Sequence, residues 1–302
     1  MRRRPILWGF LIGSTVFAIF FVLAVLALSA IPESSGSSML PGDKIAVVKI
    51  QDMILDTEDT LENITDYGND DSIRAIIVRI DSPGGAVGPS QEIYRELWRI
   101  RGENDKVIVA SLGGTAASGG YYIASAAHRI VANPGTLTGS IGAIMQFMNV
   151  QELLEKIGVD PEVVKSGRFK DIGSYDRKMT DDERALLQGV IDDVLSQFVG
   201  AVAQGRGMSE DAVRAIADGR IFTGRQAMEA GLVDSLGNFN DAVEVAADLA
   251  NIQGKPRLVH PREARPDFLD LFLDELIGGF SQRLARELRG TTPVEIPQLH
   301  YR

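Results

Sequence analysis

A serine within a glycine-rich turn is the first residue of this sequence with the chemistry of a nucleophile. Ser118 lies between the apolar run Val107–Ala110, which predicts a buried strand, and the small-residue run Tyr121–Ala127, which predicts a buried helix. This order places Ser118 near a helix N-terminus, where free N–H groups and the helix dipole favour the negative charge that forms in acyl transfer. Ser118 is therefore the candidate nucleophile, and the alternative is a serine that only caps the helix.

A serine nucleophile needs a base, and histidine is the first side chain to consider. His128 follows Ser118 by ten residues at the far end of the same predicted helix, roughly 15 Å away. His260 and His300 lie in the C-terminal part of the chain, beyond the alternating strands and helices. Histidine is therefore not the expected base.

Lysine is the remaining familiar base, but an ammonium in water titrates near pH 10.4 and acts as a base only if burial removes its proton. Three loop lysines fit on chemistry alone, namely Lys165, Lys170 and Lys178. The default interpretation of each is a solvated surface lysine. Composition and spacing do not choose among them.

Strands and helices alternate along the chain and predict an α/β fold with a largely parallel sheet. Residues 44–50 and 73–80 read as the first two strands, separated by a polar helix over 57–69. Gly84 and Gly85 follow the second strand directly and precede an amphipathic helix over about 89–101. Two glycines there let the backbone approach a ligand closely, or simply form a tight turn with Pro83.

The middle of the chain is less regular. The glycine-containing run 138–148 is either a strand edge that pairs with a peptide or a buried strand. We expect a short helix over 151–158, a strand over 161–164, a polar loop over 165–174 and a strong helix from Thr180 to about 204.

Composition excludes several classes of function. The 302 residues are 45% hydrophobic and can bury a substantial core in one or two domains. A net charge of −10, without a basic stripe, argues against a nucleic-acid partner. The absence of cysteine excludes a disulfide framework, a thiolate metal site and a cysteine nucleophile.

The N-terminus predicts a membrane anchor. Arginines at positions 2–4 precede an uncharged, mostly apolar run over 5–32, which is long enough to cross a bilayer. A cleaved signal peptide is the alternative, but its apolar region is only about 7–15 residues long. The positive-inside rule then leaves the N-terminus in the cytoplasm and the rest of the chain on the other side. A Ser- and Gly-rich linker over 33–41 separates the anchor from the domain.

Five motifs, in order, resemble the signal peptide peptidase A family of Ser-Lys proteases. They are Ser-Pro-Gly-Gly at 82–85, Ala-Ala-Ser-Gly-Gly-Tyr-Tyr-Ile at 116–123, Thr-Gly-Ser-Ile-Gly at 138–142, Ser-Gly-Arg-Phe-Lys-Asp-Ile-Gly-Ser at 166–174 and Gly-Arg-Ile-Phe-Thr-Gly-Arg-Gln-Ala at 219–227. The similarity covers about residues 44–250. The chain looks like a short, single-domain member, with a protease domain over 42–252 and a C-terminal helical extension and tail over 253–302.

The resemblance assigns a role to each candidate residue. It implies that Ser118 is the nucleophile, that Lys170 is the general base and that the Ser140 hydroxyl orients the lysine. The backbone N–H groups of Gly85 and Gly119 are then the oxyanion hole. No metal or other cofactor is implied.

The resemblance also implies the setting in which the chain works. The family has a ClpP/crotonase-like fold of repeated β-β-α-type units, with an N-terminal transmembrane helix. It forms ring-like homo-oligomers, and in short members neighbouring subunits can contribute the serine and the lysine. The implied substrates are remnant signal peptides at the bacterial cytoplasmic (inner) membrane, with the catalytic domain on the periplasmic side.

Two other enzymatic functions remain open. One is a related membrane protease that cuts a stomatin-like or other membrane protein. The other is a crotonase-type acyl-CoA enzyme, which also uses glycine amides but needs neither a serine nucleophile nor an anchor. An inactive membrane scaffold is a further alternative. The apolar helix predicted over about 268–288 packs on a neighbouring subunit or on its own domain, lies on the membrane, or brings the tail into the active site as a pseudo-substrate.

Overall fold

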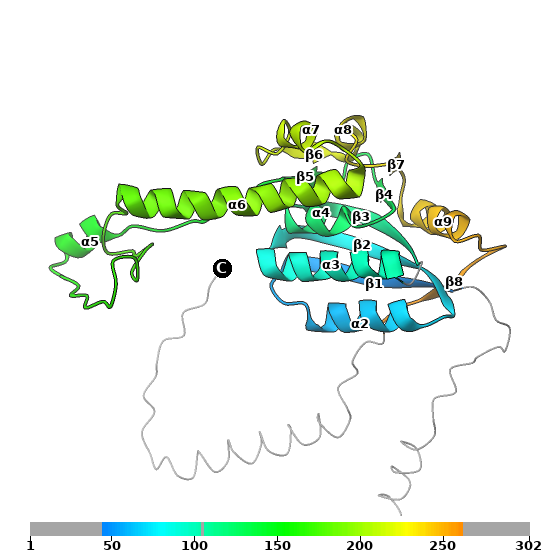
Figure 1. Cartoon of the computed structure of the whole chain (residues 1–302), viewed down its shortest axis with the longest axis horizontal. Helices are drawn as coiled ribbons and strands as arrows, with labels where there is room; N and C mark the ends of the chain where they lie inside the picture. Colours follow the sequence, from blue (N-terminus) through cyan, green and yellow to red (C-terminus); the bar gives the residue numbers. More distant parts are fainter. Residues whose placement is uncertain (1–43, 104–105, 262–302) are drawn as a thin grey trace, which may run out of the picture.

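A mainly parallel β-sheet forms the centre of the chain (Figure 1). The computed structural model describes residues 44–103 and 106–261, so the predicted anchor, the linker and the apolar helix after residue 261 lie outside the described residues. The described strands are β1 Lys44–Ile54, β2 Ile73–Gly85, β3 Val107–Ala117, β4 Arg129–Ala132, β5 Leu137–Gly139, β6 Ile221–Thr223, β7 Ser235–Leu236 and β8 Arg257–Val259.

The sheet runs in the order β6-β5-β3-β2-β1-β8, with β4 and β7 branching from β3. All described pairs are parallel except β5 with β6. Helices connect the parallel strands, because a parallel pair needs a long crossover. The predicted α/β fold is confirmed at this level. The sheet also continues past residue 252, because β8 pairs with β1.

Successive residues of the central strands point to opposite faces of the sheet and build two cores. On one face, Ala46, Val48 and Ile50 of β1 pack beneath several helices, whereas Ile45 of the same strand faces the other side. The described helices are α2 Glu58–Asn69, α3 Val87–Glu103, α4 Gly119–Ala124, α5 Gln151–Lys156, α6 Asp181–Arg206, α7 Glu210–Arg214, α8 Gly224–Glu229 and α9 Phe239–Leu249.

The two faces carry different helices. Buried side chains of α2, α3, α4 and the C-terminal half of α6 belong to the first core, while Ala242 and Ala246 of α9 belong to the second. Both faces of β2 are therefore covered, which explains why its residues 75–78 form an unbroken buried apolar run.

An arm, which we define as residues 143–193, projects away from the sheet (Figure 1). It contains α5, a long loop and the N-terminal half of α6. Thr180 begins α6 with a capping box, in which its side chain accepts from the Glu183 N–H and the Glu183 carboxylate accepts from the Thr180 N–H. The helix predicted from Thr180 is confirmed.

Two predictions for the arm region are corrected. No strand forms over 161–164, because the segment has no neighbouring strand and Val163 and Val164 are exposed. A buried strand over 138–148 is also wrong, since β5 ends at Gly139 and Ile144 is 88% exposed. The alternative, a run that pairs with a peptide, stays a prediction.

Within the described residues, α6 is long and apolar enough to span a membrane by length and composition. Phe198, Val199 and Val202 in its C-terminal half are, however, buried in the core of the domain. We therefore treat α6 as a helix that joins the arm to the domain.

Candidate active site

Three neighbouring strands end at one place on the sheet, and four of the five predicted site residues lie there. Ser82 of β2 pairs with Ala116 of β3, and Ala117 of β3 pairs with Gly139 of β5. Ligands of open α/β sheets bind outside the carboxyl ends of the strands. Gly85 lies at the end of β2, whereas Ser118 and Gly119 directly follow β3 and Ser140 directly follows β5.

The backbone of Ser118 has an uncommon conformation. Its φ is 52° and its ψ is −121°, in a region that glycine favours. Such a conformation costs about 1–3 kcal/mol and persists only where the surrounding structure imposes it. Its N–H donates to the Gly139 carbonyl at 2.9 Å, and its carbonyl accepts from the Tyr122 N–H at 2.8 Å. The turn is therefore fixed on both sides of the serine.

The side chain of Ser118 does not cap α4. The residue occupies the N-cap position, as the sequence predicts, but its hydroxyl makes no capping hydrogen bond. No other residue of the described chain hydrogen-bonds this hydroxyl. The purely structural role considered for Ser118 therefore lacks the bond that would define it.

Gly84, Gly85 and Gly119 bring two backbone segments into close approach. A Cβ on Gly119 would lie 3.3 Å from the Gly85 nitrogen and 2.4 Å from the Ser90 Oγ. A Cβ on Gly84, whose φ is +103°, would lie 2.8 Å from the Gly119 nitrogen and 2.8 Å from the Ser118 Cβ. The two predicted oxyanion-hole glycines thus lie side by side, next to the serine. Side chains at these positions would close the space.

A small hollow of about 30 Å³ opens beside these residues. Its polar lining comes from Gly85, Ser90, Gln91, Ser118, Gly119 and Gly142. Its apolar lining comes from Val87, Tyr122, Val194 and Phe198. Tyr122 packs against Phe198 with 4.9 Å between ring centroids, and burial raises the pKa of its phenol. This tyrosine is accordingly a neutral, apolar wall at physiological pH.

Ser140 directly follows β5 and lies at the same end of the sheet as Ser118. Its φ is 50°, which makes it the second serine of this site with a left-handed backbone. Its N–H donates to the Arg220 carbonyl at 2.8 Å, which fixes the turn against the segment before β6. The sequence motif around residue 140 is therefore a strained turn beside that of Ser118.

Lys170 is not brought to the other site residues within one chain. It is exposed and lies in the loop of the arm, where its N–H donates to the Gly167 carbonyl at 3.2 Å. The hollow beside Ser118 is lined by no residue of the arm. Within the described chain, no hydrogen bond or ion pair engages the Lys170 amine. The single chain therefore presents the serine and the lysine separately.

The other candidate bases have different partners. The Nδ1 atom of His128 accepts from the Ile108 N–H at 3.0 Å, so this histidine binds the sheet backbone. Lys165 is ion-paired with Asp171 at 2.6 Å, so its amine already has a carboxylate partner. Lys178 is exposed in the arm.

Comparison with known protein families identifies the family to which this chain belongs. A model of the family described as Peptidase family S49 matches residues 101–253, which include Ser118, Ser140 and Lys170. The chain belongs to peptidase family S49. Gly85 lies before the matched segment, so its assignment depends on its position against Gly119.

Relatives with similar sequences are named as proteases. A putative protease of Synechocystis is 52% identical over 179 residues, which are 59% of this chain and 64% of the relative. Protease 4 of Salmonella typhi is 35% identical over 84% of this chain and 42% of its own length. A putative signal peptide peptidase SppA of Enterococcus faecium is 41% identical over 58% of this chain and 51% of its own length. The chain therefore spans between 42% and 64% of these relatives.

A solved structure shares the fold of this S49 member. It is that of a mutant of the 1510-N membrane-bound stomatin-specific protease, with a TM-score of 0.50 and 15% identity. The match covers 74% of this chain and the whole of the other. At this identity the likeness concerns the fold alone.

Proposed function

We propose that this chain is a serine endopeptidase that uses a Ser118–Lys170 dyad. The observation that carries the proposal is the strained, uncapped Ser118 held against two glycine amides in a member of a peptidase family. Gly85 and Gly119 are the oxyanion hole, and Ser140 orients the lysine. The ClpP/crotonase-like form of the α/β fold is part of the same proposal.

The reaction follows from the chemistry of these groups. A neutral Lys170 takes the Ser118 proton while the serine oxygen attacks a peptide carbonyl. The Gly85 and Gly119 N–H groups stabilise the negative oxygen that forms, and Lys170 then returns the proton to the leaving amine. Water hydrolyses the acyl-enzyme by the same route. No metal or other cofactor takes part.

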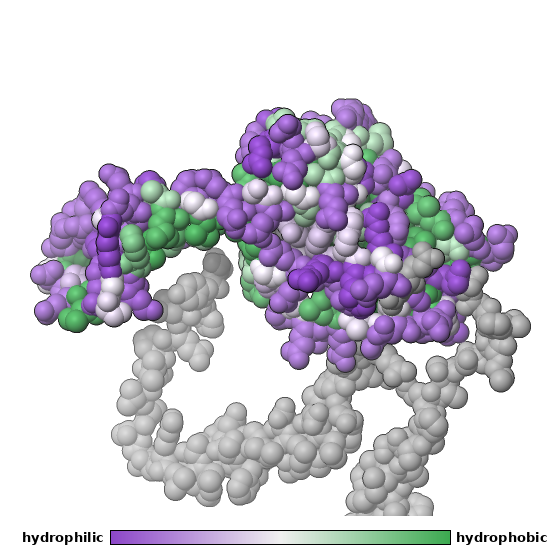
Figure 2. All heavy atoms as spheres, in the orientation of Figure 1, coloured by the Kyte–Doolittle hydropathy of each residue, from purple (hydrophilic) through white to green (hydrophobic). Residues whose placement is uncertain are grey.

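The lysine comes from a neighbouring copy in this proposal. The support is the exposed apolar surface of the arm, which a single chain leaves in water (Figure 2). Its exposed apolar residues include Ile144, Met145, Phe147, Met148, Leu153, Ile157, Val159, Val163, Val164, Leu186 and Val190. An arm that packs on a second copy buries this surface and carries Lys170 into a drier site. Such packing makes a homo-oligomer with its active sites between subunits.

The proposed substrates are membrane peptides. The Enterococcus relative is named as a putative signal peptide peptidase, which supports signal peptides as substrates. In this proposal they are remnant signal peptides, and the anchor predicted over 5–32 holds the domain beside them. In this proposal the chain crosses the bacterial inner membrane once, with the domain on the periplasmic side. The apolar wall of Val87, Tyr122 and Phe198 receives an apolar side chain of the peptide.

A peptidase assay on the full chain in detergent tests the dyad. We expect a fluorogenic signal-peptide substrate to be cleaved by the wild type, and both Ser118→Ala and Lys170→Ala to lose at least about 1,000-fold in kcat. A Ser118→Ala variant with full activity would contradict the proposal and favour a crotonase-type reaction. Comparison with a stomatin-like peptide separates the two protease alternatives.

A further inference from the structure

The arm has a polar centre instead of an apolar one. Of residues 143–193, all of which are described, Glu183 is the only buried residue. Its side chain is 3% exposed, and that of Asp171 is 14% exposed. Carboxylates are rarely buried unless they are paired. The shape of the arm therefore depends on the cation that pairs with them.

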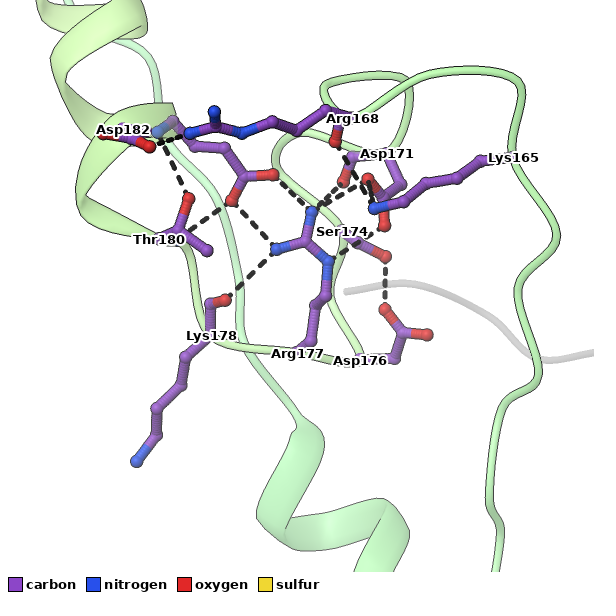
Figure 3. Close-up of polar contacts among 10 residues, drawn as sticks. Lys165, Arg168, Asp171, Ser174, Asp176, Arg177, Lys178, Thr180 and Asp182 are labelled. Carbon is purple, nitrogen blue, oxygen red and sulfur yellow. Dashed lines mark hydrogen bonds and ion pairs between the residues drawn. The ribbon is translucent and has the colours of Figure 1, made fainter.

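That cation is Arg177, which hydrogen-bonds both carboxylates, and Figure 3 shows its guanidinium facing Asp171. Its Nε donates to Asp171 at 2.9 Å, and its Nη1 donates to Glu183 at 2.9 Å. Its Nη2 donates to the Glu183 carboxylate and, at 3.2 Å, to the backbone carbonyl of Asp171. A planar guanidinium with five N–H groups makes such a set of bonds, and an ammonium does not.

Asp171, which Arg177 holds in this way, directly follows Lys170 in the sequence. Asp171 is fixed through its carboxylate and through its own carbonyl, and its second partner is Lys165 at 2.6 Å. On the other side, the Lys170 N–H closes a turn onto Gly167. Arg177 thus ties the backbone beside Lys170 to the first turn of α6.

Charge keeps this connection intact at neutral pH. The Arg177 guanidinium holds the pKa of Asp171 far below its usual range and lowers that of Glu183 to about 2. Both carboxylates are ionised at pH 7. The guanidinium therefore faces two full negative charges.

We propose that Arg177 is a positioning residue for catalysis, which fixes the backbone at Lys170 relative to α6 and so sets where the lysine amine is presented. The proposal depends on the Ser118–Lys170 dyad. Because α6 continues into the core, where Val194 and Phe198 line the hollow beside Ser118, the same helix connects the lysine loop to the domain. Arg177 itself touches neither serine.

Steady-state kinetics of Arg177→Gln test this role on the full chain. A misplacement of about 1 Å in a catalytic group costs on the order of 100-fold, so we expect kcat to fall by about 10- to 100-fold with little change in KM. Arg177→Lys keeps the positive charge but lacks the planar guanidinium that bonds both carboxylates. Its kcat should therefore lie between those of Arg177→Gln and the wild type. The matched control is Arg184→Ala, which removes an exposed arginine next to Glu183 and should leave kcat unchanged.

The controls separate positioning from stability. Thermal unfolding and the mass of the assembly are measured for each variant. An unchanged kcat in Arg177→Gln would overturn the proposal, and so would a loss of kcat that follows a loss of folding or assembly. If the wild type is active but does not need Ser118 or Lys170, the proposed function fails, whatever Arg177 does.

Discussion

The proposed nucleophile, Ser118, differs from most residues of the chain in its backbone conformation. Ser118 has a positive φ, and hydrogen bonds to Gly139 and from Tyr122 hold it there. Strain of this kind persists only where the surroundings impose it, and it is frequent at active sites. In the proposed function, this conformation presents the uncapped Ser118 hydroxyl beside the Gly85 and Gly119 amides.

The contribution of the Gly119 amide can be isolated with two substitutions. Gly119→Pro removes the N–H at the first position of α4, where proline is otherwise tolerated, and should lower kcat by about 100- to 1,000-fold. A Cβ at this position would also crowd the Ser90 Oγ at 2.4 Å. Gly119→Ala introduces the same Cβ and keeps the N–H, so it is the matched control.

Comparing kcat of the two variants shows whether the loss comes from the missing Gly119 N–H or from the added Cβ. We expect the alanine variant to retain much more activity than the proline variant. Equal losses in both would mean that crowding, and not the amide, matters at residue 119.

The sequence predicts the serine better than it predicts the base. Ser118 follows a buried strand and precedes a small-residue helix, and this local order makes it a candidate nucleophile with a helix cap as the alternative. Lys170 is one of three polar-loop lysines, and only the family motif distinguishes it. Arg177 gives no local signal, because it lies in an irregular segment and its partners Asp171 and Glu183 are each six residues away, one in the loop and one in the first turn of α6.

Among the parts of the chain, the secondary structure of the arm is the one that the sequence predicts least well. A strand was expected over 161–164 because Val163 and Val164 are β-branched and apolar. In the structure both are exposed and no strand adjoins them. Apolar residues that a single chain leaves in solvent give the same pattern as residues that it buries, so periodicity alone cannot separate the two cases.

The ionic centre of the arm should respond to acid. The pKa of Glu183 is lowered from 4.5 to about 2, and a lowered pKa stabilises the structure above the ordinary value. That stabilisation is complete above about pH 4.5 and is lost progressively as the pH falls towards 2. We expect hydrogen-exchange protection of residues 171–183, corrected for the intrinsic effect of pH, to fall in this range.

A glutamine variant provides the control for this acid response. Residue 183 of Glu183→Gln carries no charge to lose, so the acid response of its arm should be smaller than that of the wild type and should come from Asp171, whose pKa is also held low. Glu152→Gln, which alters an exposed glutamate of α5, should behave as the wild type. An acid response in Glu183→Gln as large as that of the wild type would show that Glu183 is not its source.

At the scale of the whole molecule, the sequence predicts the centre of the sheet well and its edge poorly. The alternation of strands and helices predicted the parallel sheet, because residues such as 75–78 are apolar on both faces of β2. The sequence did not predict that β8 extends the sheet beyond residue 252. Three residues that pair only at the sheet edge are too short a run for a pattern to detect.

Ser118 and Lys170 lie apart in a single chain, so the proposed dyad requires two copies of the chain to associate. Ser118 lies at the carboxyl ends of β2, β3 and β5, whereas Lys170 is exposed on the arm. In the proposed homo-oligomer, each arm reaches the next copy and brings its Lys170 to the Ser118 of that copy. This proposal predicts that the peptidase activity depends on assembly.

Complementation between two inactive variants tests this claim most directly. Ser118→Ala and Lys170→Ala chains, each inactive alone, are co-expressed in equal amounts, and the mixed assemblies are assayed on the fluorogenic signal-peptide substrate. Each site needs an intact serine from one copy and an intact lysine from the next, so random mixing should restore about one quarter of the wild-type kcat. No activity in mixed assemblies of the wild-type mass would contradict the account.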